Sequence, residues 1–552
     1  MYLFLLHNKM LSRPLVYILA ASVILEDFAF SQSEPFKING QLSISTESYS
    51  SNGIQARRTK SLIRTNFRST ITLWDKVTIP IDILLFSKGQ PFSQPFNLYS
   101  MSPQLFGWLT LHGGYLSTRL SDLTFGDTRF LGGGFDARPG KFRLSVFSGQ
   151  SQRAVATDTA NGTRGKYRRM LIGGKLGYGT DDGFFIDLNF LRAADDSNSL
   201  NNAPIDVAPK ENAVVSLAFG LPLVDKKLKC SGEVSLAALT NDLRAEETDA
   251  VGGMLRSIFT PHSSSQIDGA ARLTVNVISS QTFAVGLNAR WIGPGYVSLG
   301  YAQLPNDVLD ATLSPALRLF DNKLSLKSSF GLRYNNLRNN RLATTRRIIG
   351  SVSTTIQPTP MFGADLQYSN YGMRSRPKND TLSVDNLTQS LSISPRYTLD
   401  SFGGTSTLMA TLYVQGFSDN NRMRSGNNDN TTKSLMTAWS LVLPSTLMLT
   451  TTIAYTSSET PTVTTTIKNF SETVGYRFFD NKLSTSLTVG YNLITTYSSD
   501  NQLNGRVNAS YRIERWGTIS MNLFANSYAY RESSQATSFN ELQGILTYNV
   551  SF

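Results

Sequence analysis

The feature that most constrains this chain is an alternation of apolar and polar residues that recurs almost from end to end. In the stretch SLTVGYNL, for example, Leu487, Val489 and Tyr491 alternate with Thr488 and Asn492. Successive side chains of a strand point to opposite faces, so this pattern predicts strands with one apolar and one polar face. No stretch reaches the roughly 18 consecutive apolar residues that a membrane-spanning helix needs.

The composition indicates where such strands lie. Charged residues make up only 17% of the chain and aromatic residues 11%, whereas about a quarter of a soluble domain is charged. A β-barrel in lipid has this profile, and a secreted β-rich protein would share part of it. We therefore predict an all-β fold: a single large antiparallel transmembrane β-barrel, with short periplasmic turns and longer extracellular loops.

The connections support this architecture. From Glu211 onward, short turns such as FDNK at Phe320–Lys323 and Phe479–Lys482 alternate with longer polar links, as in outer-membrane barrels. About twenty-five alternating runs can be counted, but such barrels have an even number of strands. We predict roughly 26 strands, with 24 as the next choice. The rhythm breaks between Phe92 and Lys141, where one strand is either missed or wrongly assigned.

The first residues predict export. Lys9 and Arg13 precede an apolar run of about a dozen residues, which is too short to span a bilayer. Ala29 and Ser31 then place small residues before a cleavage site. We predict a signal peptide at 1–31 and a transmembrane barrel at 32–552, located in the cell outer membrane; translation could start at Met1 or at Met10.

The last strand carries a second signal. Leu546, Tyr548, Val550 and Phe552 alternate with polar residues up to the end of the chain. This strand resembles the C-terminal assembly signal of Gram-negative outer-membrane barrels, which implies recognition by the barrel-assembly machinery. The expected partners are therefore that machinery, outer-membrane lipid and lipopolysaccharide, with a protein partner at the surface loops as a further hypothesis. No nucleic acid is expected, because the basic residues are spread along the chain.

Four stretches carry a wider resemblance: SPQLFGWLTLHGGY, PGKFRLSVFSGQ, WIGPGYVSLGY and TTRRIIGSVS. They resemble a group of large, poorly characterised outer-membrane barrel proteins of the Bacteroidetes and their relatives. The resemblance implies a location and a fold for most of the mature chain. It implies no activity.

Residues suited to catalysis or to metal binding are scarce. Beyond the leader the chain has only His112 and His262, and Cys230 is its single cysteine. The Gly-rich stretch GGGFDARPGKF lacks the spacing of a phosphate-binding loop. We interpret His112 as a hydrogen-bonded histidine facing the lumen, because no spacing selects a serine or aspartate partner for it. We therefore predict no metal, no cofactor and no enzymatic activity.

The charge of the chain suggests a function. The formal net charge is +12, and Arg64, Arg68, Lys327 and Arg333 fall on the polar faces of their strands. Such cations either line the lumen, where they favour anionic solutes, or pair with lipid headgroups at the rims. The leading hypothesis is a channel that passes solutes or polypeptide. The alternatives are an occluded barrel that binds a partner through its loops and, least supported, a barrel-embedded hydrolase.

Overall fold

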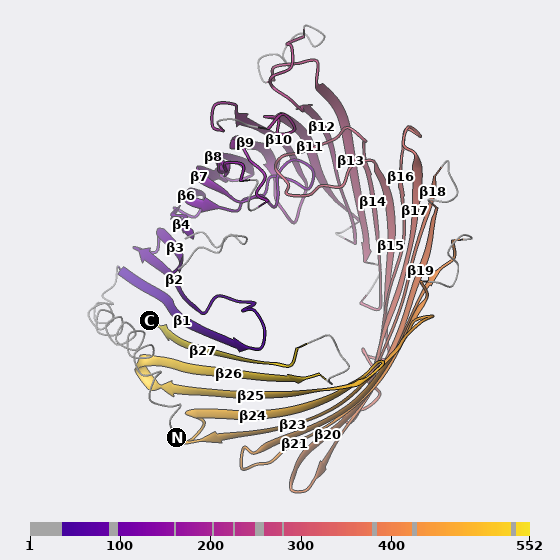
Figure 1. Ribbon diagram of the computed structural model, residues 1–552. Coiled ribbons are helices and arrows are strands. Elements are labelled where there is room, and N and C mark those ends of the chain that lie inside the picture. Colours follow the sequence, from indigo (N-terminus) through magenta and orange to yellow (C-terminus); the bar gives the residue numbers. More distant parts are fainter. Residues whose placement is uncertain are drawn as a thin grey trace.

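The chain folds into a large ring of antiparallel strands (Figure 1). The computed structural model describes residues 36–87, 98–158, 162–200, 204–224, 227–248, 259–278, 281–377, 383–421, 428–530 and 537–552. The predicted signal peptide at 1–31 lies outside these residues. No helix in the described part is long and apolar enough to cross a membrane.

The described strands have the following bounds: β1 (Phe36–Asn52), β2 (Ser61–Leu73), β3 (Val77–Phe86), β4 (Leu98–Met101), β5 (Gln104–Leu105), β6 (Leu109–Leu116), β7 (Phe130–Ala137), β8 (Phe142–Gln152), β9 (Arg168–Gly179), β10 (Phe185–Asp196), β11 (Glu211–Leu223), β12 (Leu228–Thr240), β13 (Ser265–Ile278), β14 (Phe283–Ile292), β15 (Val308–Leu319), β16 (Leu324–Asn335), β17 (Ala343–Ile356), β18 (Phe362–Pro377), β19 (Val384–Ser401), β20 (Gly404–Asp419), β21 (Asn430–Val442), β22 (Met448–Glu459), β23 (Thr464–Phe478), β24 (Leu483–Thr495), β25 (Ser499–Ile513), β26 (Gly517–Ala529) and β27 (Phe539–Ser551). A short 3-10 helix, η3 (Glu514–Trp516), forms the turn before β26.

Strands β4 and β5 are the two halves of a single, interrupted wall strand. Both β4 and β5 pair with β3 on one side and with β6 on the other. The break falls at Ser102 and Pro103, because proline has no N–H to donate to the ladder. The barrel therefore has 26 strands around its wall, which confirms the predicted number. The break also lies within the stretch from Phe92 to Lys141, where the sequence pattern was irregular.

The last strand closes the ring against the first. Leu42 stands opposite Val550 and Ile44 opposite Tyr548 in the β1–β27 ladder. Beyond the end of β27, the N–H of Gly40 donates to the carbonyl of Phe552 at 2.8 Å, and the N–H of Phe552 donates back at 3.0 Å. The wall thus has no free edge at this seam.

The short turns lie at one end of the barrel and the longer connections at the other, as predicted. The two FDNK turns have almost identical backbones: φ is 54°, 53° and 68° at Phe320, Asp321 and Asn322, and 53°, 52° and 68° at 479–481. The amino end of β1 and the carboxyl end of β27 lie at this short-turn end, which is the periplasmic end in outer-membrane barrels.

The outward face is apolar. Leu487 is 48% exposed and Val489 45% exposed, whereas Thr488 between them faces inward and hydrogen-bonds to Thr473 at 2.9 Å. Aromatic side chains gather near the short turns, as in the interfacial girdles of membrane barrels; they include Phe142, Tyr178, Phe402, Trp439, Phe478 and Phe479. This is a transmembrane barrel of the outer membrane.

Candidate lumen site

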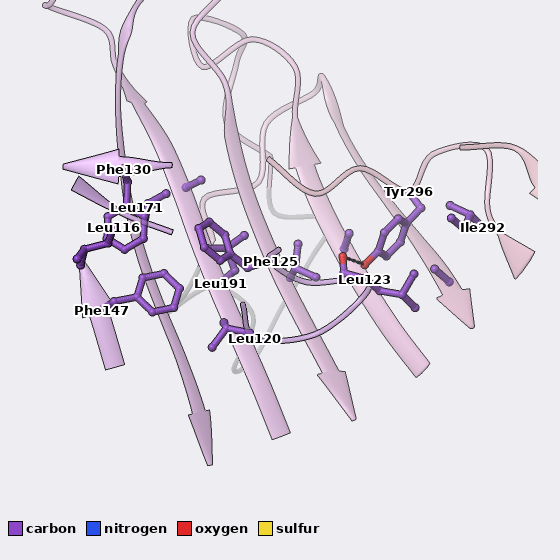
Figure 2. Packing of buried hydrophobic residues seen from close by; sticks show 14 residues of the cluster. Leu116, Leu120, Leu123, Phe125, Phe130, Phe147, Leu171, Leu191, Ile292 and Tyr296 are labelled. Carbon is purple, nitrogen blue, oxygen red and sulfur yellow. Dashed lines mark hydrogen bonds between the residues drawn. The ribbon is translucent and has the colours of Figure 1, made fainter. Parts of the chain in front are cut away.

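A segment between β6 and β7, residues 117–129, lies against the inner face of the wall instead of extending from the rim. Leu123 and Phe125 are 1% and 0% exposed. The ring of Phe125 packs on that of Phe147 at 4.9 Å between centroids, and Leu191 belongs to the same cluster (Figure 2). We call this segment the first inner segment.

Polar groups of the wall fix its backbone. The carboxylate of Glu233 accepts the N–H of Asp122 at 3.0 Å and the N–H of Leu123 at 3.2 Å. The hydroxyl of Thr124 donates to the Ser216 hydroxyl at 2.7 Å. A buried backbone needs such partners, because unpaired polar groups away from water are costly.

A second inner segment, residues 293–307 between β14 and β15, packs on the first. The Tyr296 hydroxyl bonds to Ser235 on the wall at 2.7 Å and donates to the carbonyl of Leu123 at 3.0 Å. The hydroxyl of Ser298 donates to the carbonyl of Thr124 at 2.5 Å. A Cβ at Gly300 would lie 2.6 Å from the ring of Phe125, so only glycine permits this approach.

Together the two inner segments cover one arc of the wall. Among the described residues, the apolar cluster buried with them is made up of residues from β6 to β14 and from the segments themselves. Several wall residues of this arc are apolar where a polar lumen would be expected; they are Leu171, Leu191, Val214, Ala237, Ala270 and Ile292. Their burial explains why these strands depart from a clean alternation.

Charged groups lie beneath the first inner segment, around a cavity of about 300 Å³. Asp187 lies 3.4 Å from Nη1 of Arg143 and 3.6 Å from Nζ of Lys175. Asp122 pairs with Arg272 of the wall. Each cation has a carboxylate next to it, so this network attaches the segment rather than adding net charge to the lumen.

The four basic residues singled out in the sequence have different surroundings. Arg68 pairs with Asp82 at 3.2 Å, and Arg333 pairs with Asp310 at 3.1 Å. The guanidinium of Arg64 lies over the ring of Phe86 at 5.4 Å. Lys327 is exposed, and none of the described carboxylates forms an ion pair with it. The four are not brought together into one site.

His112 has partners that the sequence did not indicate. Its Nδ1 lies 3.0 Å from the hydroxyl of Ser102, and its Nε2 lies 2.7 Å from Oδ2 of Asp136. The hydroxyl of Ser145 donates to the other oxygen of Asp136. Ser102, His112 and Asp136 line a cavity of about 430 Å³ that Arg68 and Arg129 also line.

The C-terminal signal residues lie together on the outward face of the seam. Tyr548 and Val550 are buried in one cluster with Leu42. Leu546 stands opposite Thr46 of β1 and Met521 of β26. Their role in assembly remains a prediction.

Comparison with known proteins gives no family. No family model and no curated protein matches the chain. Among solved structures, the translocation pore of the P pilus usher PapC is 11% identical at a TM-score of 0.34, and the match covers 93% of this chain and 99% of that pore chain. OccK2 of Pseudomonas aeruginosa is 11% identical at a TM-score of 0.28, with 94% and 98% covered. Identities this low leave the function to be inferred from the chain's own lumen.

Neither inner segment was predicted. The stretch LSDLTF of the first inner segment lies within the region from Phe92 to Lys141 where the predicted strand count was uncertain. A usable signal would have been the pairing of two irregular, Gly-containing links, GPGYVSLGY and TFGDTRF, each with a buried aromatic. Within the described part of the chain, no group of three or more histidine, cysteine, aspartate or glutamate residues is placed to hold a metal.

Proposed function

We propose that this chain is an outer-membrane channel for small polar solutes. The observation that carries the proposal is the asymmetry of the inner face. The inner segments pack on the arc from β6 to β14, whereas the inner faces of later strands are polar and partly exposed. Barrels of 16 to 18 strands already enclose an aqueous channel. A barrel of 26 strands lined on one arc leaves room for water beside the inner segments.

The polar arc supports the proposal further. Thr488 bonds to Thr473 at 2.9 Å, and Asn492 donates to Gln502 at 3.1 Å. Asn508 donates to Ser486 at 3.0 Å. Side chains of this kind bond both to one another and to passing water, so they favour a wet surface.

The solutes that we propose are anions. Arg68 and Arg333 each have a carboxylate partner, so their charge is largely neutralised locally. Lys327 is exposed and has no ion pair among the described residues, so it contributes a free positive charge. A fixed cation at the wall raises the local concentration of anions.

Planar-bilayer recording of the purified, heat-modifiable barrel tests the function. We expect stable conductance steps and a reversal potential, in a salt gradient, that indicates a preference for anions. Conductance near zero would overturn the channel and favour the occluded barrel that binds a partner through its surface loops. A preference for cations would overturn only the choice of solute.

The remaining partners are proposals that follow from the same architecture. The outward apolar face is suited to outer-membrane lipid and lipopolysaccharide, and the strand from Leu546 to Phe552 is suited to recognition by the barrel-assembly machinery. Pull-down of the assembly machinery with the intact chain, and its loss when Phe552 is removed, would test the second partner.

A further inference from the structure

The cavity beside β4 to β8 contains a serine, a histidine and an aspartate in a hydrogen-bonded row. Ser102 lies where the wall strand is broken by Pro103, and the register of the flanking pairs places it opposite His112. Gly134, which stands opposite His112 on the next strand, has no side chain to occupy the space over it. The imidazole therefore reaches past Gly134 to Asp136, two residues further along β7.

The two hydrogen bonds fit one neutral tautomer of the imidazole. In this tautomer Nε2 of His112 carries the proton and donates it to the Asp136 carboxylate across the 2.7 Å contact. Nδ1 then has a free lone pair, which accepts the hydroxyl proton of Ser102 across 3.0 Å. This is the arrangement of a base that can activate a serine, with the two ring nitrogens exchanged relative to the usual Ser-His-Asp order.

Further groups equip the site to bind a substrate. Arg129, at the end of the first inner segment, is exposed, and no described carboxylate forms an ion pair with it. The cavity of about 430 Å³ is large enough for a small organic molecule, and because Arg68 on its wall is already paired with Asp82, Arg129 supplies the free guanidinium. A guanidinium binds carboxylate and phosphate groups well.

We propose that Ser102, His112 and Asp136 form a serine hydrolase site for a small carboxylic ester that carries a negative charge. Ser102 Oγ attacks the ester carbonyl carbon while its proton moves to Nδ1 of His112. Asp136 stabilises the imidazolium, which then returns the proton to the departing alcohol oxygen. Water, deprotonated by His112, hydrolyses the acyl-serine, releases the carboxylic acid and restores the hydroxyl. The proposal goes beyond conduction and does not depend on it.

A fluorophosphonate probe tests the serine directly, because a nucleophilic serine displaces fluoride and keeps the phosphonate. We expect the folded barrel to be labelled on Ser102, as located by peptide mass. Ser102→Ala should lose this label. Ser100→Ala should keep it, because Ser100 lines the same cavity but is not the serine that bonds to His112. Asp136→Asn and His112→Gln should slow labelling by about 10²-fold or more, since a general base contributes about 10² to 10⁴.

Heat-modifiability on gels establishes that each variant is folded, and conductance of Ser102→Ala should equal that of the unaltered chain. Hydrolysis of a succinylated nitrophenyl ester, lost in Ser102→Ala and weakened in Arg129→Gln, would establish the substrate class. An unlabelled Ser102 in the folded, unaltered barrel would overturn the proposal. Labelling that is equally fast in folded His112→Gln would also overturn it, because the serine would then react without its base.

Discussion

The ring of Phe552, the last residue, stacks on the ring of Phe67 in β2, with 6.2 Å between centroids and 21° between planes. The two residues belong to different sides of the seam, since β27 pairs with β1 and β1 pairs with β2. The terminal ring thus spans the whole width of the first strand. It joins the end of the chain to the second strand of the barrel.

Replacing the terminal ring should therefore weaken closure. We expect Phe552→Ala to lower the amount of heat-modifiable protein in the membrane, while the molecules that do assemble keep normal conductance. Phe552→Tyr should be milder, because it retains the ring and adds a hydroxyl that the interface can hydrate. Equal yields of Phe552→Ala and the unaltered chain would show that the contact with Phe67 does not contribute to assembly.

Gly40 lies beneath that ring, and its lack of a side chain is required there. A Cβ at Gly40 would lie 2.6 Å from Cζ of Phe552 and 2.8 Å from the carbonyl oxygen of Arg68. We expect Gly40→Val to destabilise the barrel by about 1–3 kcal/mol, the usual cost of overpacking. Gly416→Val is the matched control, because nothing lies within 4 Å of a Cβ there. Urea unfolding of both variants measures the difference, and equal midpoints would contradict the prediction.

Adjacent residues of β24 should respond oppositely to charge. Val489 is 45% exposed on the outward face, so Val489→Arg should cost about 2–4 kcal/mol near the bilayer midplane and impair assembly. Thr488→Arg places the same charge in the lumen and should be tolerated. Folded yield in lipid vesicles separates the two variants. Equal tolerance would contradict the placement of Val489 against lipid and Thr488 in the lumen.

Glu233 should control how firmly the first inner segment is held. Glu233→Ala removes the acceptor for two backbone N–H groups, at a cost of about 1–3 kcal/mol for each group left unpaired. We expect larger and noisier conductance steps as the segment loosens. Glu459→Ala, at an exposed carboxylate that pairs with Lys433 at 3.6 Å, should leave the steps unchanged. Identical recordings from both variants would mean that the segment does not limit flow.

Lys327 should set part of the ion preference. Lys327→Glu replaces a free cation on the inner face with an anion, so the reversal potential should shift toward cations. Lys323→Glu makes the same change of charge in the neighbouring short turn and should shift it less. A larger shift of the reversal potential in Lys323→Glu than in Lys327→Glu would place the selective region at the rim. The shifts should shrink at high salt, because salt screens exposed charges.

Much of the barrel could be predicted because strand alternation is local. The faces of Thr488 and Val489 follow from a period of two, and the number of strands follows from alternation together with the requirement for an even count. The partners of His112 could not be found in this way. Ser102 and Asp136 reach it only through the register of three strands and through a break at Pro103, and neither is visible in a spacing along the chain.

The inner segments were missed for a related reason. The residues that hold them, such as Glu233 and Ser216, lie about a hundred positions away from the backbone groups and hydroxyls that they bind. Their apolar contacts imitate a lipid-facing pattern, so Leu191 and Val214 look like outward residues although they face inward. Local periodicity does not distinguish burial under a loop from burial in lipid.

The inner segments also make the barrel wall uneven in a mechanical sense. From β6 to β14 the wall is backed by a second layer of packed chain, whereas among the described residues no such cluster backs the later strands. A cylinder with one thick arc and one thin arc bends where it is thin. Lateral pressure in the bilayer would therefore change the curvature of β16 to β27 first. The thick arc, which includes His112 on β6 and lies next to Ser102, would keep its shape.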